Sequence, residues 1–235
     1  MHRNTFHDLL NHVVKDVERP RILISGSTDE SMLDIVYSCP TLHGKNLSVD
    51  AVDKCHTPLE RMSRYAKTKG IKLGVYCEDI LDFDKGHSYD IIVTHAFMGY
   101  FDTVKRRLLV KRWRSLLLSG GHLITIQRIR DVTSPERVSF TPSQASNFVA
   151  HAISAAAKTD PSMASDDVRD VAKGFVENFY SYPITSIHDF KDLFISSGFS
   201  ISKLSLEKFQ APELQLSGPS VPSQSLYACV AAKRV

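Results

Sequence analysis

The chain has few cysteines for its length. Only four occur among 235 residues, and no two of them form a C-x-x-C pair. They are scattered along the chain at Cys39, Cys55, Cys77 and Cys229. A disulfide framework or a structural zinc site needs clustered ligands at fixed spacing. The sequence therefore predicts no bound metal, and thiols that stay reduced as they do in the cytoplasm.

Long apolar runs are also missing. A membrane-spanning helix needs about 18 to 20 consecutive apolar residues, and no run in this chain approaches that length. The first residues, MHRNTFHDLLNHVVKD, lack the apolar segment of a secretory signal and show the pattern of an amphipathic helix. We therefore expect a cytoplasmic protein that has no membrane partner.

Neither sign of charge dominates. The chain has 29 basic and 26 acidic residues, a net charge of +3. The densest basic cluster lies in a helical pattern and comprises Lys105, Arg106, Arg107, Lys111, Arg112 and Arg114. Its apolar spacing predicts a helix whose basic face is solvated. Because no basic groove is apparent, the composition argues against nucleic acid as a partner.

Short apolar runs alternate with helical patterns from residue 21 to residue 127. The runs expected to form strands are Arg21–Ser25, Leu47–Val52, Lys72–Cys77, Asp90–His95 and His122–Gln127. The helical patterns between them are Ser31–Ser38, Pro58–Thr68 and Thr103–Leu118, and Gly70 and the Gly120-Gly121 pair are expected at helix ends. This alternation predicts an α/β fold, with a parallel sheet covered by helices on both faces.

The rhythm breaks between Val132 and Tyr182 and then returns. The interruption suggests two helices, and it is followed by a further helix and two strands. The expected helices are Ser143–Lys158, Asp166–Ser181 and Ser186–Ser196, and the strands are Phe199–Leu206 and Ser225–Ala232. The two final strands can pair as an antiparallel edge on a parallel sheet. The segment between them has turn residues and no periodicity.

Residues suited to binding a nucleoside follow the first three strands. Gly26-Ser27-Thr28-Asp29 follows the first strand, where a glycine lets the backbone approach a ligand, although a tight turn explains it equally well. Asp53 ends the second strand and could accept hydrogen bonds from ribose hydroxyls. The alternatives are that Asp53 caps the turn beginning at Lys54, or that Asp50 takes the ribose instead.

The third strand ends in Cys77-Glu78-Asp79-Ile80. The Asp79 carboxylate could accept a hydrogen bond from an adenine amino group, with the backbone N–H of Ile80 meeting a ring nitrogen. A helix cap is the alternative interpretation, because acidic residues are common at such junctions. Three successive strand ends thus point to one nucleoside.

The order of these motifs resembles the class I S-adenosylmethionine-dependent methyltransferases. The resemblance covers residues 21–129 and 187–232, and the segment WRSLLLSGGHLIT closely resembles that family's approach to its fifth strand. It implies a Rossmann-like sheet of seven strands, with the last strand antiparallel and placed next to the fifth. The implied cofactor is S-adenosylmethionine, leaving as S-adenosylhomocysteine. The cofactor-binding positions that it implies are Gly26, Ser27, Thr28, Asp29, Asp53, Lys54, Asp79, Ile80, His95 and Ala96.

The first loop departs from the family pattern. Ile24 stands where the family has an acid, and Thr28 and Glu30 stand where it has glycines. We expect Thr28 and Asp29 to bind the ammonium group of the cofactor in place of the missing contacts; the alternative is that the side chains at these positions obstruct the methionine end.

Fewer sequence features point to the residues that would bind the methyl acceptor. His95 lies where the resemblance places the transferred methyl group, and we expect it to act as base or orienter, or else only to line the pocket through its backbone. The insertion is expected to form a lid over a small-molecule acceptor that is methylated on oxygen or nitrogen. The residues that are candidates for contacting this acceptor are Tyr100, Arg128, Arg130, Phe148, Phe179, Tyr180 and Tyr182.

We expect one domain over residues 1–235. Its parts are an N-terminal helix (1–19), a cofactor-binding core (20–129), a helical lid (130–185) and a final helix with an antiparallel strand pair (186–235). Two other functions stay open: a non-catalytic nucleoside-binding or interaction module, and an NAD(P)-dependent oxidoreductase. The latter needs G-x-G-x-x-G, and the chain has Gly-Ser-Thr-Asp-Glu-Ser. The sequence leaves the oligomeric state open, a homodimer included.

Overall fold

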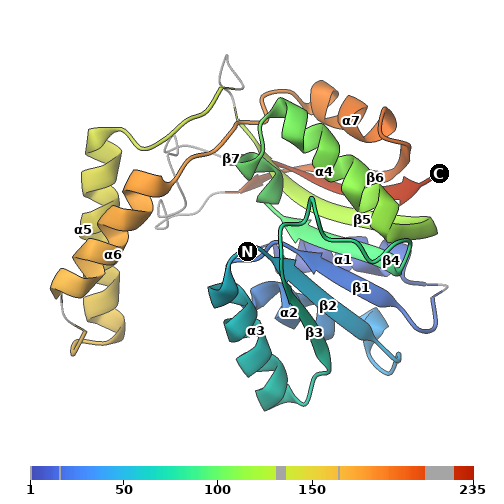
Figure 1. Cartoon of the computed structure of the whole chain (residues 1–235), viewed down its shortest axis with the longest axis horizontal. Coiled ribbons are helices and arrows are strands. Elements are labelled where there is room, and N and C mark those ends of the chain that lie inside the picture. The colour runs from blue at the N-terminus through green and yellow to red at the C-terminus, as the bar shows by residue number, and fades with distance from the viewer. Residues whose placement is uncertain (1, 16, 131–135, 164, 210–224) are drawn as a thin grey trace.

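A seven-stranded sheet forms the centre of the protein (Figure 1). The computed structural model describes residues 2–15, 17–130, 136–163, 165–209 and 225–235. The strands are β1 (Arg21–Ser25), β2 (Ser48–Asp53), β3 (Leu73–Cys77), β4 (Tyr89–His95), β5 (Leu117–Ile129), β6 (Phe199–Phe209) and β7 (Ser225–Arg234). Their order is β3-β2-β1-β4-β5-β7-β6, with β7 antiparallel to both of its neighbours. The predicted fold class is confirmed, including the antiparallel last strand next to the fifth.

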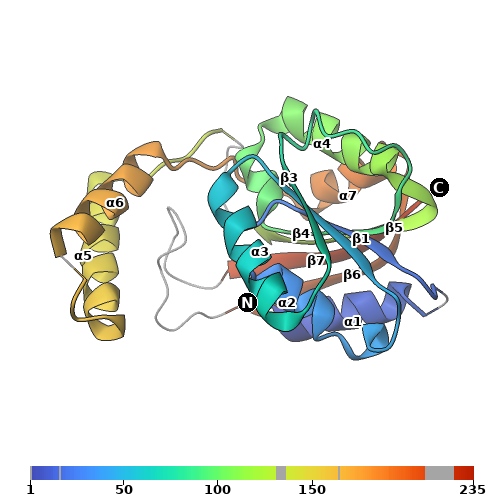
Figure 2. The same ribbon diagram turned by 60° about the horizontal axis from the view of Figure 1, so that its bottom comes forward.

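Helices cover both faces of this sheet (Figure 2). The described residues form the helices α1 (Arg3–Val13), α2 (Ser31–Tyr37), α3 (His56–Lys69), α4 (Thr103–Leu116), α5 (Pro142–Thr159), α6 (Ser165–Asn178) and α7 (Ile187–Ile195), with short 3-10 turns η1 (Pro40–Leu42) and η2 (Phe97–Tyr100). Helices α1, α2 and α3 pack on one face, and α4 and α7 pack on the other. No helix in the described ranges is long and apolar enough to cross a membrane.

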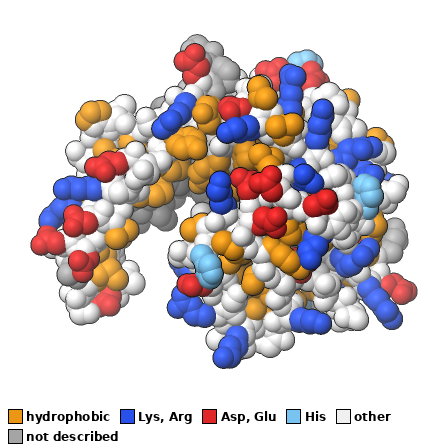
Figure 3. All heavy atoms as spheres, viewed as in Figure 1, with side chains coloured by type: hydrophobic (Ala, Val, Ile, Leu, Met, Phe, Trp, Pro, Cys, Tyr) orange, Lys and Arg blue, Asp and Glu red, His pale blue; other side chains and the backbone are white. Residues whose placement is uncertain are grey.

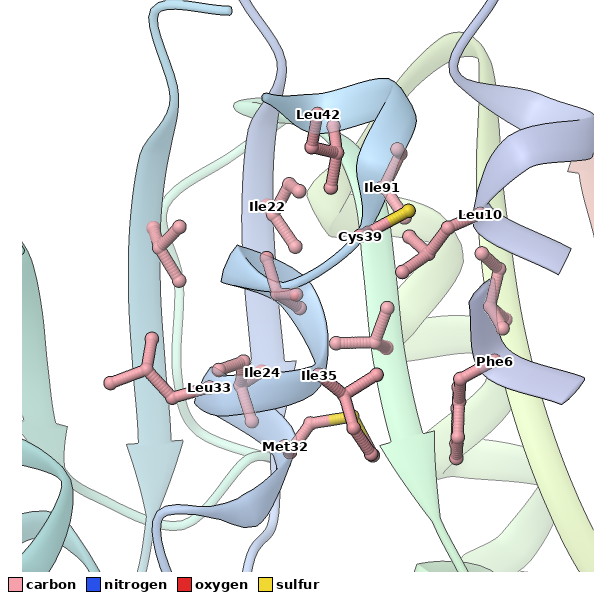
Figure 4. Packing of buried hydrophobic residues seen from close by; sticks show 14 of the residues in the cluster. Phe6, Leu10, Ile22, Ile24, Met32, Leu33, Ile35, Cys39, Leu42 and Ile91 are labelled. Atoms are coloured by element: carbon pink, nitrogen blue, oxygen red, sulfur yellow. The ribbon is translucent and has the colours of Figure 1, made fainter. Parts of the chain in front are cut away.

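The core on the α1 face follows from the alternation of the strands. Ile22 and Ile24 of β1 point to this face, beside Ile91 of the neighbouring β4 (Figure 4). Phe6 and Leu10 of α1 complete the layer and are fully buried. Burying one such side chain is worth about 1.5–3 kcal/mol, so α1 is an integral part of the fold.

Helix α4 corrects the expectation of a solvated basic face. Arg106 is buried, although Lys105 and Arg107 on either side are exposed. Arg112 and Arg114 are half-buried and donate to the backbone carbonyls of Leu81 (2.9 Å) and Gly198 (3.1 Å). These arginines tie α4 to neighbouring segments, because a guanidinium group has several N–H donors that can reach backbone carbonyls.

The only tryptophan of the chain, Trp113, lies on the buried side of α4. Its indole N–H donates to the hydroxyl of Ser25 at 2.9 Å. Ser25 is the last residue of β1, so this hydrogen bond joins the C-terminal turn of α4 to the strand end that precedes Gly26.

Gly120 and Gly121 do not end a helix as expected. Helix α4 already ends at Leu116, and both glycines lie inside β5. The pairing with β4 shifts between Tyr89 and Ile91 at this point, and Gly120 has a φ of +77°. A residue with positive φ is what a bulge of this kind requires, and glycine adopts it without strain.

The insertion forms a helical hairpin, α5 and α6, that stands beside the sheet rather than on either face (Figures 1 and 2). Thr141 and Gln144 form a reciprocal capping box at the start of α5. Phenylalanine rings hold the base of the hairpin together through ring contacts of 5.1–6.2 Å, among Phe140, Phe148, Phe175 and Phe179. Residues 131–135, 164 and 210–224, which include the segment between β6 and β7, lie outside the described residues.

Candidate functional site

The carboxyl ends of β1, β2, β3 and β4 meet at one edge of the sheet. The backbone N–H of Gly26 donates to the carbonyl of Val52 at 2.9 Å, and the N–H of Glu78 donates to that of Asp53 at 3.0 Å. Parallel strands bring the predicted cofactor residues together in this way. This edge, next to the first strand, is where open α/β sheets bind ligands.

Gly26 is required by two local constraints. Its φ is +70°, and a Cβ built on it would lie within 3.0 Å of three ring carbons of Phe97. Phe97 comes from η2, after β4, and sequence reasoning did not select it. The space over Gly26 is therefore occupied by the protein's own aromatic ring, and a cofactor would meet Phe97 at this point.

The rest of the first loop is fixed by local hydrogen bonds. The hydroxyl of Ser27 donates to the carbonyl of Asp29 (2.6 Å), and Oδ1 of Asp29 accepts the N–H of Ser31 at the start of α2 (2.8 Å). Thr28 is exposed, whereas Asp29 is half-buried. The loop thus presents the Thr28 side chain to solvent and keeps one oxygen of Asp29, Oδ2, outside these bonds.

Asp53 links the first two loops. One carboxylate oxygen accepts the N–H of Ser27 (3.0 Å), and the other accepts the N–H of Cys55 (2.7 Å). A carboxylate offers about four acceptor positions, so two remain for ribose hydroxyls. Its partial exposure keeps those positions within reach.

Asp79 and Lys54 form an ion pair across the ends of β2 and β3. The Lys54 Nζ to Asp79 Oδ2 distance is 3.4 Å, and the other oxygen of Asp79 accepts the N–H of Leu81 at 3.0 Å. Asp79 therefore also closes a turn, whereas the alternative interpretation was that it caps a helix. The Ile80 side chain is 4% exposed and packs in the core on the α4 face, so it offers a ligand only its backbone.

His95 ends β4, and its ring lies under the start of α1. The rings of His2 and Phe6 are 5.6 and 5.9 Å from it, centroid to centroid. Its Nε2 is buried and has no hydrogen-bond partner among the described residues. Burial is the main cause that lowers the pKa of His95 to about 4, so the ring is neutral at physiological pH. Ala96, the next residue, has a left-handed φ of +52°.

The turn η2 is held by a buried arginine. The guanidinium group of Arg106 donates to the carbonyl oxygens of Met98 (3.2 Å), Phe101 (3.0 Å) and Tyr182 (3.0 Å). Burial lowers the pKa of Arg106 to about 10, which leaves it charged at neutral pH. The buried guanidinium group thus joins η2, the turn that contains Phe97 and Tyr100, to the segment that follows the hairpin.

Tyr100 belongs to η2, next to the end of β4, and is 45% exposed. Desolvation of its hydroxyl and, secondly, the negative charge of Asp53 raise the pKa of Tyr100. Its ring also meets Phe179 of the insertion at 6.3 Å. Hydrophobic side chains gather on the surface where the hairpin meets the body (Figure 3). Tyr100 therefore connects the strand ends to the insertion.

The other predicted acceptor contacts lie in two groups. The rings of Tyr180 and Tyr182 are 5.9 Å apart, and the N–H of Tyr182 donates to the carbonyl of Gly99 (2.7 Å). Arg128 lies opposite Tyr227 in the β5–β7 register. Burial and, secondly, the positive charge of Arg128 lower the pKa of Arg130. Only the tyrosines are brought to η2 by these contacts.

Three residues of the site region escaped sequence reasoning: His2, Phe97 and Arg106. Arg106 had a usable signal, because it stands three, four and seven residues before the buried residues of α4, Leu109, Val110 and Trp113. His2 and Phe97 had none, since their neighbours come from distant parts of the chain.

A cavity elsewhere does not involve these residues. It measures about 490 Å³, lies between α3 and β3, and is lined by His56, Leu59, Glu60, Ser63, Arg64, Val75 and Cys77. Within the described residues, no three His, Cys, Asp or Glu side chains are close enough to share a metal ion.

Comparison with known proteins finds similar folds among solved structures but no similar sequence. No family model matches the sequence, and no curated protein is similar to it in sequence. A solved S-adenosylmethionine-dependent methyltransferase of Methanosarcina mazei is similar over 94% of this chain and 95% of its own, with 15% identity and a TM-score of 0.60. At this identity the likeness concerns the fold alone.

Two further solved structures share the fold. A 1,6-didemethyltoxoflavin-N1-methyltransferase of Burkholderia thailandensis, solved with 1,6-didemethyltoxoflavin and S-adenosylhomocysteine, is similar over 100% of this chain and 80% of its own (10% identity, TM-score 0.60). The [4+2]-cyclase SpnF is similar over 97% and 80%, respectively (11% identity, TM-score 0.62). The chain therefore has the Rossmann-like fold of class I methyltransferases, as the sequence resemblance implied.

Proposed function

We propose that the protein transfers the methyl group of S-adenosylmethionine to a small-molecule acceptor. The observation that carries this proposal is the placement of Asp53 and Asp79 at adjacent strand ends, with acceptor positions left on Asp53, in the fold of known methyltransferases. The Burkholderia structure, which holds S-adenosylhomocysteine and a small heterocycle, supports the choice of both ligands.

The residues present fit an adenosine. Asp53 faces the ribose hydroxyls with its remaining lone pairs, as a carboxylate at the end of the second strand does in nucleoside-binding sheets. Asp79 and the backbone of Ile80 lie one strand further along the edge, where the base is expected. The Lys54–Asp79 pair is largely exposed on the lysine side, so breaking it costs little.

We assign the binding of the amino-acid end of the cofactor to the first loop and the end of β4. Gly26 itself is covered by Phe97, so we assign this end to Ser27, Thr28 and Asp29 rather than to a bare glycine loop. S-adenosylmethionine supplies, when bound, a methyl group on a positively charged sulfur, which an oxygen or nitrogen nucleophile displaces in line. The chain then has mainly to position the two reactants.

The acceptor is expected beside η2 and the insertion. Tyr100, Tyr182 and Phe179 bring aromatic surface to the mouth of the site. Such surface binds planar, partly apolar molecules by stacking. Arg128 and Arg130 lie at the end of β5 and stand as candidates for an acidic group on the acceptor.

Removal of a proton from a hydroxyl acceptor requires a base within hydrogen-bonding reach. His95 was the sequence candidate, but its Nε2 is inaccessible to solvent beneath His2 and Phe6. A base role for His95 therefore requires residues 2–6 to move aside.

A second function is favoured by two specific observations. Ile24, Thr28 and Glu30 replace the acid and glycines of the family loop, and a protein named as a [4+2]-cyclase has the same fold. A protein that binds the nucleoside without transferring its methyl group is the alternative. An NAD(P)-dependent oxidoreductase gains no support from the first loop.

Calorimetric titration separates these functions. We expect saturable binding of S-adenosylhomocysteine and none of NADH or NADPH. Binding of the nicotinamide cofactor alone would overturn the proposal. Binding of S-adenosylhomocysteine without transfer of radiolabelled methyl to any member of a panel of phenols, carboxylates and heterocyclic amines would favour the non-catalytic alternative.

A further inference from the structure

The two helices of the hairpin bury very little of their surface. Of the described residues in these helices, α5 has none that is buried, and α6 has only Ala172 and Val176. Helices in proteins gain most of their stability from packing an apolar face against further structure. The hairpin stands beside the sheet and is covered by neither of its faces (Figures 1 and 2). Its exposed apolar surface is therefore a candidate for contact with another molecule.

The exposed side of α6 combines an apolar pair with acidic residues. Val171 and Phe175 are 75% and 41% exposed, and they lie one helical turn apart. Asp167 lies one turn before Val171 on the same side, and Asp170 lies at its edge. Both carboxylates are exposed, and no described residue forms an ion pair with either of them. We call this set of four residues the acidic face.

The exposed side of α4 has the same apolar spacing and the opposite charge. Val104 and Leu108 are 71% and 52% exposed, again one turn apart. Lys111 continues the same side of the helix, because positions i, i+4 and i+7 share one face, and Lys105 lies at its edge. Both lysines are exposed, and no described residue forms an ion pair with them. We call this set of four residues the basic face.

The acidic and basic faces complement each other. Each has an apolar pair at its centre, and each lies on a helix of 14 residues, about 21 Å long. Opposite charges around an apolar centre favour association, whereas like charges oppose it. Helix α6 stands in the hairpin and α4 lies over the sheet, on different parts of the molecule (Figures 1 and 2). The two faces therefore do not meet within one copy of the chain.

We propose that two copies of this chain form a dimer in which α6 of each copy packs on α4 of the other. Specific interfaces bury about 800 Å² on each partner, and one helix-on-helix contact is small by that measure. A two-fold axis makes the same contact twice, because α4 and α6 of one copy meet α6 and α4 of the other. The hairpins thus act as arms that reach across to the partner copy.

The order of the residues favours an antiparallel crossing of the two helices. In that orientation Leu108 meets Val171 and Val104 meets Phe175. Lys111, which follows the apolar pair of α4, then lies opposite Asp167, which precedes the apolar pair of α6. A parallel crossing would instead place Lys111 beyond Phe175, away from Asp167 and Asp170.

Reversal of charge on the full chain tests this arrangement. One variant, Lys105→Glu with Lys111→Glu, makes the α4 face acidic. Another, Asp167→Lys with Asp170→Lys, makes the α6 face basic. Sedimentation equilibrium at micromolar concentrations measures the mass and the dissociation constant of each variant alone, of their equimolar mixture, and of a chain with all four substitutions.

We expect the wild-type chain to sediment with twice the mass of one chain. Each double variant alone should dimerise about tenfold more weakly or worse, because like charges then face each other at both contacts. Their mixture should regain the wild-type affinity, since a dimer of one copy of each places an acidic face on a basic face at both contacts. The chain with all four substitutions should also dimerise like wild type.

Lys67→Glu with Lys72→Glu is the matched control. It reverses two exposed lysines outside both faces and should leave the dissociation constant unchanged within about twofold. Leu108→Ser gives a test that does not depend on charge: it removes an apolar side chain from the centre of the contact and should weaken the dimer about tenfold. Circular dichroism and thermal unfolding show whether each variant is folded.

Three results would overturn the proposal. The first is a wild-type chain with the mass of a single copy at every concentration, which would leave the acidic and basic faces to other partners. The second is a mixture of the double variants that dimerises no better than either alone. The third is a mass that keeps growing beyond two copies, because a contact that is not reciprocal builds open chains rather than a closed dimer.

Discussion

The ring of Phe97 lies against Gly26, so that a side chain on Gly26 would collide with it. This contact joins the loop after β1 to the turn after β4. The two segments lie on neighbouring strands, and Phe97 fills the space that the absent side chain leaves. The tightness of the first loop therefore depends on a residue 71 positions further along the chain.

Gly26→Ala should destabilise the protein by about 2–4 kcal/mol, because the new Cβ overlaps Phe97 and alanine disfavours a φ of +70°. The midpoint of urea unfolding measures this effect. In a Phe97→Ala background the same substitution should cost less, since only the backbone strain remains. Equal costs in both backgrounds would show that the ring is not the obstacle.

Asp53→Ala should weaken S-adenosylhomocysteine binding by about 1–3 kcal/mol, the cost of removing a charged hydrogen-bond partner. Asp84→Ala is a suitable control, because Asp84 accepts a similar turn hydrogen bond from Gly86 (3.0 Å) on an exposed surface. Calorimetry on both variants gives the comparison. If the Asp53→Ala variant binds S-adenosylhomocysteine with unchanged affinity, Asp53 does not bind the ribose.

Arg106→Met should lower the free energy of unfolding by about 2–4 kcal/mol, because three carbonyl groups lose their charged donor. The turn carrying Phe97 and Tyr100 should loosen, and cofactor affinity should fall with it. Arg107→Met removes an exposed neighbour of the same type and should be nearly neutral. Equal stabilities of the two variants would mean that Arg106 does not hold η2.

Stability should fall as the pH drops from about 6.5 to about 4. Burial lowers the pKa of His95 to about 4, so the unfolded chain binds a proton in this range that the folded chain does not. The shift corresponds to about 3 kcal/mol at full effect, present above pH 6.5 and lost by about pH 4. Urea unfolding as a function of pH measures it.

His95→Leu should reduce this pH dependence, and His188→Leu, at a ring that is 79% exposed, should not. His122 contributes in the same direction, since burial also lowers its pKa to about 4. An identical pH profile in wild type and His95→Leu would contradict the buried neutral state of His95.

The sequence predicted the sheet well because its strands are buried on both sides. The apolar run Arg21–Ser25 is reproduced as β1, and Asp53 was found because alternation placed it at the end of β2. The Gly120-Gly121 pair was misinterpreted, since a glycine with positive φ serves a bulge in β5 as readily as a helix end. Local patterns cannot distinguish these two uses.

The side-chain surroundings of the site were less predictable. The contacts of His95 with His2 and of Gly26 with Phe97 join residues that only the completed fold brings together. The position of Arg106 could have been predicted, because its spacing from Leu109 and Trp113 places it on the buried side of α4. The surrounding basic residues concealed that signal.

The hydrogen bond between Trp113 and Ser25 gives the molecule an intrinsic optical reporter. The indole of Trp113, the only tryptophan in the chain, is shielded from water and hydrogen-bonded to Ser25, the residue just before Gly26. Any rearrangement of that loop on ligand capture would alter the polarity sensed by the indole and shift its emission. Ligand binding at this edge of the sheet should thus be measurable in the unlabelled protein, with no added dye.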